Sequence, residues 1–177
     1  MKKNYTLTFA ICITFLGCHM NKPTWTILDY SWSSNWQYSY SLKIDDNGKA
    51  FFRKNNLKID SFFVRKNIDT KELNMLTSQT AQAKLDSQYI QNNVEDAPSF
   101  KVIIYPENGV PSQYNVYGDK YPLPLKNIAS YCRLLSEQKG WIYLKDTTIT
   151  FDSYKRIPKL QVDNVKFPPP IKKEVNK

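Results

Sequence analysis

The sequence predicts an α+β fold: an antiparallel β-sheet built from hairpins, with two helices packed on one face and an extended Pro/Lys-rich C-terminal tail. The segment 36–44 alternates strictly between large apolar and polar residues, which is the pattern of a strand with one face on a core and one in water. It leads into Asp-Asp-Asn-Gly at 45–48, where Asn-Gly tolerates the positive φ angles of a tight primed hairpin turn. Segments with strand and helix patterns then follow in the order hairpins, helix, hairpin, helix.

Four strands are expected before the first helix. They cover residues 24–32, 36–44, 49–54 and 57–66, and Asn55-Asn56 is expected to turn the chain between the last two. The fourth strand begins with alternation but contains the run Phe62-Phe63-Val64. Such a run indicates a bulge or a strand that is covered on both faces.

The first helix is predicted over residues 69–85. Asp69 is suited to cap its N-terminus, and Glu72 follows three residues later, as in a capping box. Its apolar stripe, at helical spacing, consists of Leu73, Leu76, Thr80 and Ala83. A stripe of this kind is typical of a helix that covers a sheet.

The second helix is predicted over residues 125–139. Pro122 and Pro124 precede it, and Gly140 ends it. Its apolar face consists of Leu125, Ile128, Cys132 and Leu135. Because Cys132 lies on this face, we interpret it as a buried structural thiol and not as a nucleophile.

A second hairpin is predicted between the two helices. Residues 86–96 are polar and predict a turn or loop. Residues 100–105 and 113–117 predict the two strands, and the Pro-Glu-Asn-Gly segment 106–109 predicts the turn between them.

The C-terminal part of the chain changes character. Residues 141–144 and 147–151 are expected to add short edge strands. Periodicity is lost from residue 157, and Phe-Pro-Pro-Pro at 167–170 favours an extended polyproline II conformation.

The positive charge belongs mainly to this tail. Residues 155–177 contain seven basic and two acidic residues, in a chain whose net charge is +9. Two more of the positive charges, Lys2 and Lys3, lie in a segment that we expect to be removed. The body of the chain is therefore close to neutral, and nucleic acid is not an expected partner.

Residues 1–18 predict export and lipid attachment. Two lysines precede an apolar run over residues 5–16, which has the length of a signal-peptide core and is too short to span a bilayer as a helix. The ending Leu-Gly-Cys resembles the lipobox of bacterial lipoproteins, in which the cysteine, here Cys18, becomes acylated (with palmitate, for example) and anchors the protein. A plain secretory signal or a short N-terminal anchor is the alternative.

These patterns predict that the chain is divided into four parts. They are a lipoprotein signal peptide at 1–18, a tether at 19–23, a single α+β domain at 24–154 and a basic, Pro-rich tail at 155–177. Cys12 would leave with the signal peptide and Cys18 would carry lipid. Only Cys132 would remain, so we expect no internal disulfide.

The order of the motifs can be compared with a family. The segment 38–48, the helix from Asp69, the Glu-Asp-Ala-Pro link at 95–98 into the strand 100–105, and the Pro-led helix at 122–135 occur in that order. Over about residues 30–141 they resemble a Bacteroidetes lipoprotein domain of unknown function. Members often carry Cys-Pro before the Tyr-rich strand, where this chain has Asn35-Trp36, so no role of that cysteine carries over. The resemblance implies the fold and an envelope location, and no activity.

The residue types argue against the familiar catalytic sites. The single histidine, His19, is next to the proposed lipid site, so no Ser-His-Asp or Cys-His arrangement is expected in the domain. One histidine and one remaining cysteine do not suggest a zinc site, and the sequence has no glycine-rich phosphate loop. We therefore expect no catalytic residue, no metal site and no cofactor.

Aromatic and acidic residues supply the candidate binding residues. Trp36, Tyr38 and Tyr40 share one side of the predicted strand, and such residues anchor interfaces and stack on sugars. Core filling is the more common use of such a set. The adjacent acids Glu95 and Asp96 could bind a cation or a basic partner, and a solvated loop is the alternative.

These patterns lead to one functional hypothesis and two alternatives. The hypothesis is a non-enzymatic outer-membrane lipoprotein, facing the periplasm, whose domain binds a protein or an envelope polymer. A sharper version is an immunity or inhibitor lipoprotein that neutralises a toxin or enzyme. The alternatives are a hydrolase of envelope glycan that uses carboxylates such as Glu95 or Asp96, and a purely structural lipoprotein.

Overall fold

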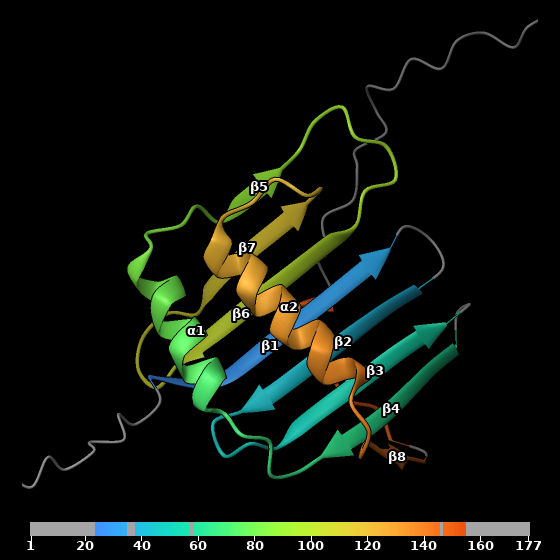
Figure 1. Ribbon diagram of the computed structural model, residues 1–177. Coiled ribbons are helices and arrows are strands. Elements are labelled where there is room, and N and C mark those ends of the chain that lie inside the picture. The colour runs from blue at the N-terminus through green and yellow to red at the C-terminus, as the bar shows by residue number, and fades with distance from the viewer. Residues whose placement is uncertain (1–23, 35–37, 57–58, 146, 155–177) are drawn as a thin grey trace, which may run out of the picture.

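In the computed structural model, the residues that the structure describes form an eight-stranded β-sheet with two helices in front of it (Figure 1). The structure describes residues 24–34, 38–56, 59–145 and 147–154. Cys18, Trp36 and the predicted C-terminal tail lie outside the described residues. The predicted α+β class, with a hairpin-built antiparallel sheet and both helices on one face, is confirmed.

The strands lie in the order β5-β7-β6-β1-β2-β3-β4-β8 across the sheet. Their bounds are β1 Trp25–Ser34, β2 Tyr38–Asp45, β3 Ala50–Asn56, β4 Ile59–Arg65, β5 Gln88–Ile90, β6 Ser99–Pro106, β7 Ser112–Tyr117 and β8 Ile142–Leu144. The helices are α1 Lys71–Gln82 and α2 Leu123–Glu137. Neighbouring strands are antiparallel except β5 and β7, which are parallel. The pairing of β1 with β6 joins the two halves of the sheet.

Both helices pack on one face of the sheet, which we call the front face (Figure 1). Strand side chains buried on this face include Leu28, Leu42, Ile44, Val102, Ile104 and Val116. The helices add Leu73 and Leu76 from α1 and Leu125, Ile128, Cys132 and Leu135 from α2. The predicted apolar face of the second helix is therefore confirmed, and its burial supplies much of the driving force for folding. Neither described helix is long and apolar enough to cross a bilayer.

The back face of the sheet is also covered, which corrects the expectation that the polar side of the second strand faces water. Ser41 is fully buried, and its Oγ accepts a hydrogen bond from Ser31 Oγ at 2.7 Å. Ser31 Oγ also lies 2.6 Å from Ser153 Oγ, in a segment that comes from β8 and crosses behind the sheet. The serines of this strand alternate with apolar residues, and this pattern predicted that they are exposed. A serine side chain is small, however, and it can be buried when its hydroxyl has a hydrogen-bond partner.

The segment 147–154 is therefore a cover and not the predicted edge strand over 147–151. Residues 147–151 have no regular secondary structure, and Phe151 is buried. The backbone oxygen of Thr150 accepts a hydrogen bond from Lys43 Nζ at 2.9 Å. The other predicted edge strand, at 141–144, is confirmed as β8.

The first hairpin turn is organised by Asp45. Its Oδ1 accepts hydrogen bonds from the backbone N–H of Asn47 at 3.1 Å and of Lys49 at 2.9 Å. Within this turn only Gly48 has a positive φ, 76°. The hydrogen bond from the N–H of Gly48 to the oxygen of Asp45 makes Asp46 and Asn47 the central residues of the turn, and neither has a positive φ. The predicted primed turn is therefore wrong in type, because primed turns require a positive φ at the first central residue or at both. A Cβ at position 48 would also collide with the backbone oxygen of Ile68.

Three local predictions differ from the structure. The cap residue of α1 is Thr70, although Asp69 Oδ1 accepts a hydrogen bond from the N–H of Lys71 at 3.0 Å, and Ala83 is exposed beyond the helix. Asn55-Asn56 continues β3 and does not turn. The predicted loop 86–96 contains the short strand β5, because residues 88–90 pair with β7 far along the chain.

Candidate functional site

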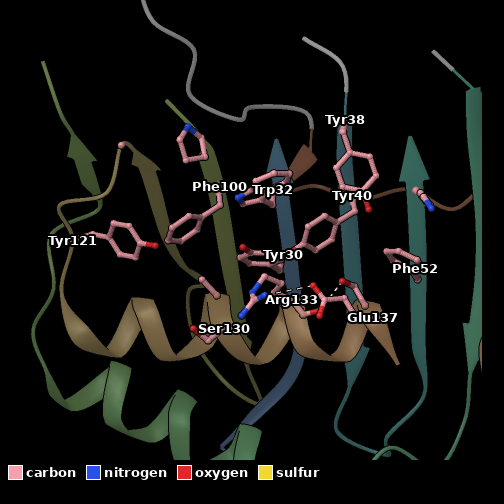
Figure 2. A pocket seen from close by; sticks show the side chains of 15 residues that line it. Tyr30, Trp32, Tyr38, Tyr40, Phe52, Phe100, Tyr121, Ser130, Arg133 and Glu137 are labelled. Atoms are coloured by element: carbon pink, nitrogen blue, oxygen red, sulfur yellow. Dashed lines mark hydrogen bonds and ion pairs between the residues drawn. The ribbon is translucent and has the colours of Figure 1, made fainter. Parts of the chain in front are cut away.

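A groove opens on the front face, on the side of α2 that points away from α1 (Figure 2). Its volume of about 570 Å³ is in the range of small-molecule sites. We call it the aromatic groove, and it is lined by Tyr30, Trp32, Tyr38, Tyr40, Phe52, Lys54, Pro98, Phe100, Gly118, Tyr121, Ala129, Ser130, Arg133, Ser136 and Glu137. Strands β1, β2, β3 and β6 form its floor, and α2 forms one wall.

The groove exists because the strands are longer than the two helices can cover. A ten-residue strand such as β1 extends about 33 Å. Two helices side by side across the strands cover only about 20 Å. The end of the front face beyond α2 therefore stays open, and residues 32 and 38 lie there, half-buried.

The composition of the front face changes along the strands. Under the helices, β1 and β2 present Leu28, Leu42 and Ile44, which are fully buried. Beyond them the same strands present only aromatic side chains to the groove. Of the fifteen described residues that line the groove, seven are aromatic, and none is leucine, isoleucine, valine or methionine.

Aromatic residues form a row across the floor. Phe100 of β6 pairs with Trp32 of β1, Trp32 pairs with Tyr40 of β2, and Tyr40 pairs with Lys54 of β3. The ring centroids of Trp32 and Tyr40 are 5.5 Å apart, and Tyr121 extends the row with its ring 5.0 Å from that of Phe100. Tyr40 and Phe100 are buried, so the ring surface that stays open to the groove belongs to Trp32, Tyr38 and Tyr121, which are half-buried.

Tyrosine hydroxyls supply polar groups inside the groove. Tyr30 is buried, and its hydroxyl is hydrogen-bonded to that of Tyr40. Burial raises the pKa of both tyrosines above the ordinary value, and it also raises the pKa of Tyr38 and Tyr121, which are half-buried. The hydroxyls therefore stay protonated at neutral pH and can donate hydrogen bonds.

The charged residues gather at one end of the groove. On α2, Arg133 Nη1 lies 3.5 Å from Glu137 Oε1, and both side chains are more than half exposed. Lys54 Nζ lies 6.0 Å from the centre of the Tyr38 ring. Glu137 adds to burial in raising the pKa of Tyr38, which places this carboxylate near that tyrosine. At the opposite end, around Tyr121, Pro98 and Gly118, none of the lining residues that the structure describes is charged.

The predicted binding residues divide into three groups. Tyr38 and Tyr40 line the aromatic groove (Figure 2), where Tyr38 is half-buried and Tyr40 is buried as part of the core. Glu95 and Asp96 are exposed and do not line it. Trp36 lies outside the described residues.

Sequence reasoning missed the lining residues that come from distant elements. Phe100 and Tyr121 are more than sixty residues from Trp32, and nothing local links them. One available signal was on α2, where Ser130, Arg133 and Glu137 follow helical spacing beside the apolar stripe. Polar residues directly beside the apolar face of a helix indicate that the sheet next to that side of the helix is not covered.

Among the residues that the structure describes, no group of three histidine, cysteine or acidic side chains is placed to hold a metal ion. Cys132 is fully buried on α2, and burial raises the pKa of its thiol. A thiol in this state is a poor nucleophile, as the sequence-based interpretation expected.

Comparison of the chain with protein-family models, with curated proteins and with solved structures finds no match. The resemblance to a Bacteroidetes lipoprotein domain therefore stays a prediction, and function is argued from the groove itself.

Proposed function

We propose that the protein is a non-enzymatic binding module of the cell envelope, anchored by lipid on Cys18, which recognises its ligand in the aromatic groove. The groove combines a preformed concavity, a floor of aromatic rings and a few polar groups at its rim. Ligand sites in proteins have this composition. An immunity or inhibitor protein fits the same description, if the ligand is a toxin or an enzyme.

The single observation that carries the proposal is the half-exposure of Trp32 and Tyr38 beside rings that are buried, those of Tyr30, Tyr40 and Phe100. Large aromatic side chains lose apolar burial when they stay partly in water. Here they do so beside one another, with ring centroids 6.0 Å apart, at the edge of a groove. Such residues dominate the binding energy of interfaces when a partner covers them.

Glycan hydrolysis by the usual mechanism needs two carboxylates on either side of the scissile bond. Glu137 is the one carboxylate among the described residues that line the groove. It already pairs with Arg133. The groove therefore supports binding better than hydrolysis.

The test is crosslinking and capture from the native envelope with the wild-type chain and with Trp32→Ala and Tyr38→Ala. We expect either substitution to reduce recovery of the captured ligand at least tenfold, because truncating a central aromatic anchor costs roughly 2 kcal/mol or more. Tyr143→Ala is the matched control, since Tyr143 is an exposed tyrosine of β8 that does not line the groove. Equal recovery with all four chains would show that the groove is not the binding site.

A further inference from the structure

The ligand class can be argued from the lining of the aromatic groove, and this argument rests on the proposed binding function. We propose that the groove binds a short linear saccharide that carries a carboxylate, with the carboxylate at the Lys54 and Arg133 end.

The apolar surface of the groove is mainly aromatic. An acyl chain is flexible and is accommodated by large aliphatic side chains, but no leucine, isoleucine, valine or methionine is among the described residues that line the groove. Rigid aromatic rings suit a ligand with flat apolar patches and polar edges. Pyranose rings have this character, because their C–H groups form a flat face and their hydroxyls point outward.

The accessible rings lie towards the two ends of a row across the strands (Figure 2). Trp32 and Tyr38 are half-buried at one end, with ring centroids 6.0 Å apart. Tyr121 is half-buried at the other end, with its ring 5.0 Å from the buried ring of Phe100. A saccharide of a few units that lies across the strands, parallel to α2, can therefore contact Trp32 and Tyr38 with one unit and Tyr121 with another.

Hydrogen-bond donors line the same path. The indole nitrogens of Trp25 and Trp141 donate to Asn74 Oδ1 and to the backbone oxygen of Leu135, at 2.7 and 3.2 Å. Within the part of the chain that the structure describes, the Trp32 indole nitrogen makes no such bond. With the protonated hydroxyls of Tyr38 and Tyr121, it can donate to sugar oxygens.

The charge at one end selects for an anion. Among the described residues that line the groove, the cations Lys54 and Arg133 are accompanied by one carboxylate, Glu137, which is paired with Arg133. Aromatic grooves can also bind quaternary ammonium ligands through cation–π attraction. Here the positive charges of Lys54 and Arg133 would repel such a cationic ligand. A ligand carboxylate could instead bind Lys54 and replace Glu137 as the partner of Arg133.

The test uses immobilised oligosaccharides of two to four units that contain uronic, muramic or sialic acid. Each has a neutral counterpart in which the carboxylate is reduced to an alcohol. We expect at least one acidic member to bind the lipid-free chain, and its reduced counterpart to bind about tenfold more weakly or not at all, as for the loss of one charge-assisted hydrogen bond. Decaproline is included because Pro-rich peptides also dock in aromatic grooves.

Two substitutions separate this inference from the proposed function. Trp32→Ala should abolish saccharide binding, whereas Arg133→Ala should reduce the preference for the acid over its reduced counterpart. Lys139→Ala is the charge control, since Lys139 is exposed and does not line the groove. Binding of none of the acidic saccharides, equal binding of acid and alcohol, or binding of decaproline alone would overturn the inference. If envelope capture still depends on Trp32 in those cases, the binding function stands and only the ligand class is wrong.

Discussion

Asp29 is a carboxylate buried on the back face of the sheet, where the cover segment 147–154 meets β1. Its Oδ2 accepts a hydrogen bond from the N–H of Asp152 at 2.7 Å, and its Oδ1 accepts one from Ser153 Oγ at 2.5 Å. Lys43 Nζ is 3.8 Å away. Burial nevertheless outweighs these contacts and raises the pKa of Asp29 above its ordinary value. The folded state therefore holds this proton more tightly than the unfolded state does.

The expected consequence is a pH-dependent stability, and Asp29→Asn tests it. Because the pKa is raised on folding, the contribution of Asp29 is most favourable below its unfolded pKa and declines as pH rises through the folded pKa. The asparagine variant lacks this titration and keeps an oxygen that can accept from Asp152. The free energy of unfolding, measured by chemical denaturation at pH 4 and pH 7, should fall less for the variant than for the wild type over this range. Asp119→Asn, at an exposed aspartate, controls for the loss of one charge. Equal falls for wild type and Asp29→Asn would contradict this role of Asp29.

Single residues show what a sequence can and cannot predict at this scale. The sequence predicted that Tyr38 and Tyr40 lie on the same face of the sheet, because successive strand residues face opposite sides. It could not predict whether a helix covers these rings, since that depends on the length of the strands relative to the width of the helices. The buried serines were missed for the same reason: Ser41 is hidden only because residues 147–154 return to it.

At the scale of elements, the cover segment 147–154 acts as a third layer. Phe151 is its main apolar anchor and is 3% exposed. Phe151→Ala should lower the free energy of unfolding by about 3 kcal/mol, the usual cost of removing a buried phenylalanine. Chemical denaturation measures this, with Thr148→Ala as an exposed control in the same segment. A loss below about 0.5 kcal/mol, typical of surface positions, would mean that the segment does not hold the back face.

Elements with a strong internal pattern were predictable, and those defined by distant partners were not. The second helix was found from its apolar face, which the structure buries. Strand β5 has only three residues, Gln88–Ile90, and owes its conformation to parallel pairing with β7. A segment this short carries no periodicity that could identify it.

At the scale of the whole molecule, the fold leaves one end of the front face open, and the groove follows from that. The central pairing of β1 with β6 brings Trp32 beside Phe100, although the two residues are far apart in the sequence. The class of fold could be predicted from the order of the hairpins and helices. The strand order could not be predicted, because loop lengths and strand patterns permit several arrangements of the two hairpins. The groove could therefore not be predicted either, because its residues come together only in this strand order.

The location of the molecule is the last property that the sequence predicts, and it depends on Cys18. If Cys18 carries acyl chains, the wild-type protein should partition into the detergent phase and sediment with membranes, because buried methylene groups contribute about 0.8 kcal/mol each to anchoring. Cys18→Ala should move the protein to the aqueous phase and abolish incorporation of a labelled palmitate analogue.

Cys12→Ala provides a matched control for that experiment. Cys12 lies within the segment that should be removed before the mature protein is anchored, so its substitution should leave partitioning and labelling unchanged. Detergent partitioning of Cys18→Ala with no labelling of the wild type would instead indicate an uncleaved N-terminal anchor. Aqueous partitioning of the wild type would indicate a plain secretory signal. In that case the groove would act in a freely diffusing protein, and lipid anchoring would no longer be part of the proposed function.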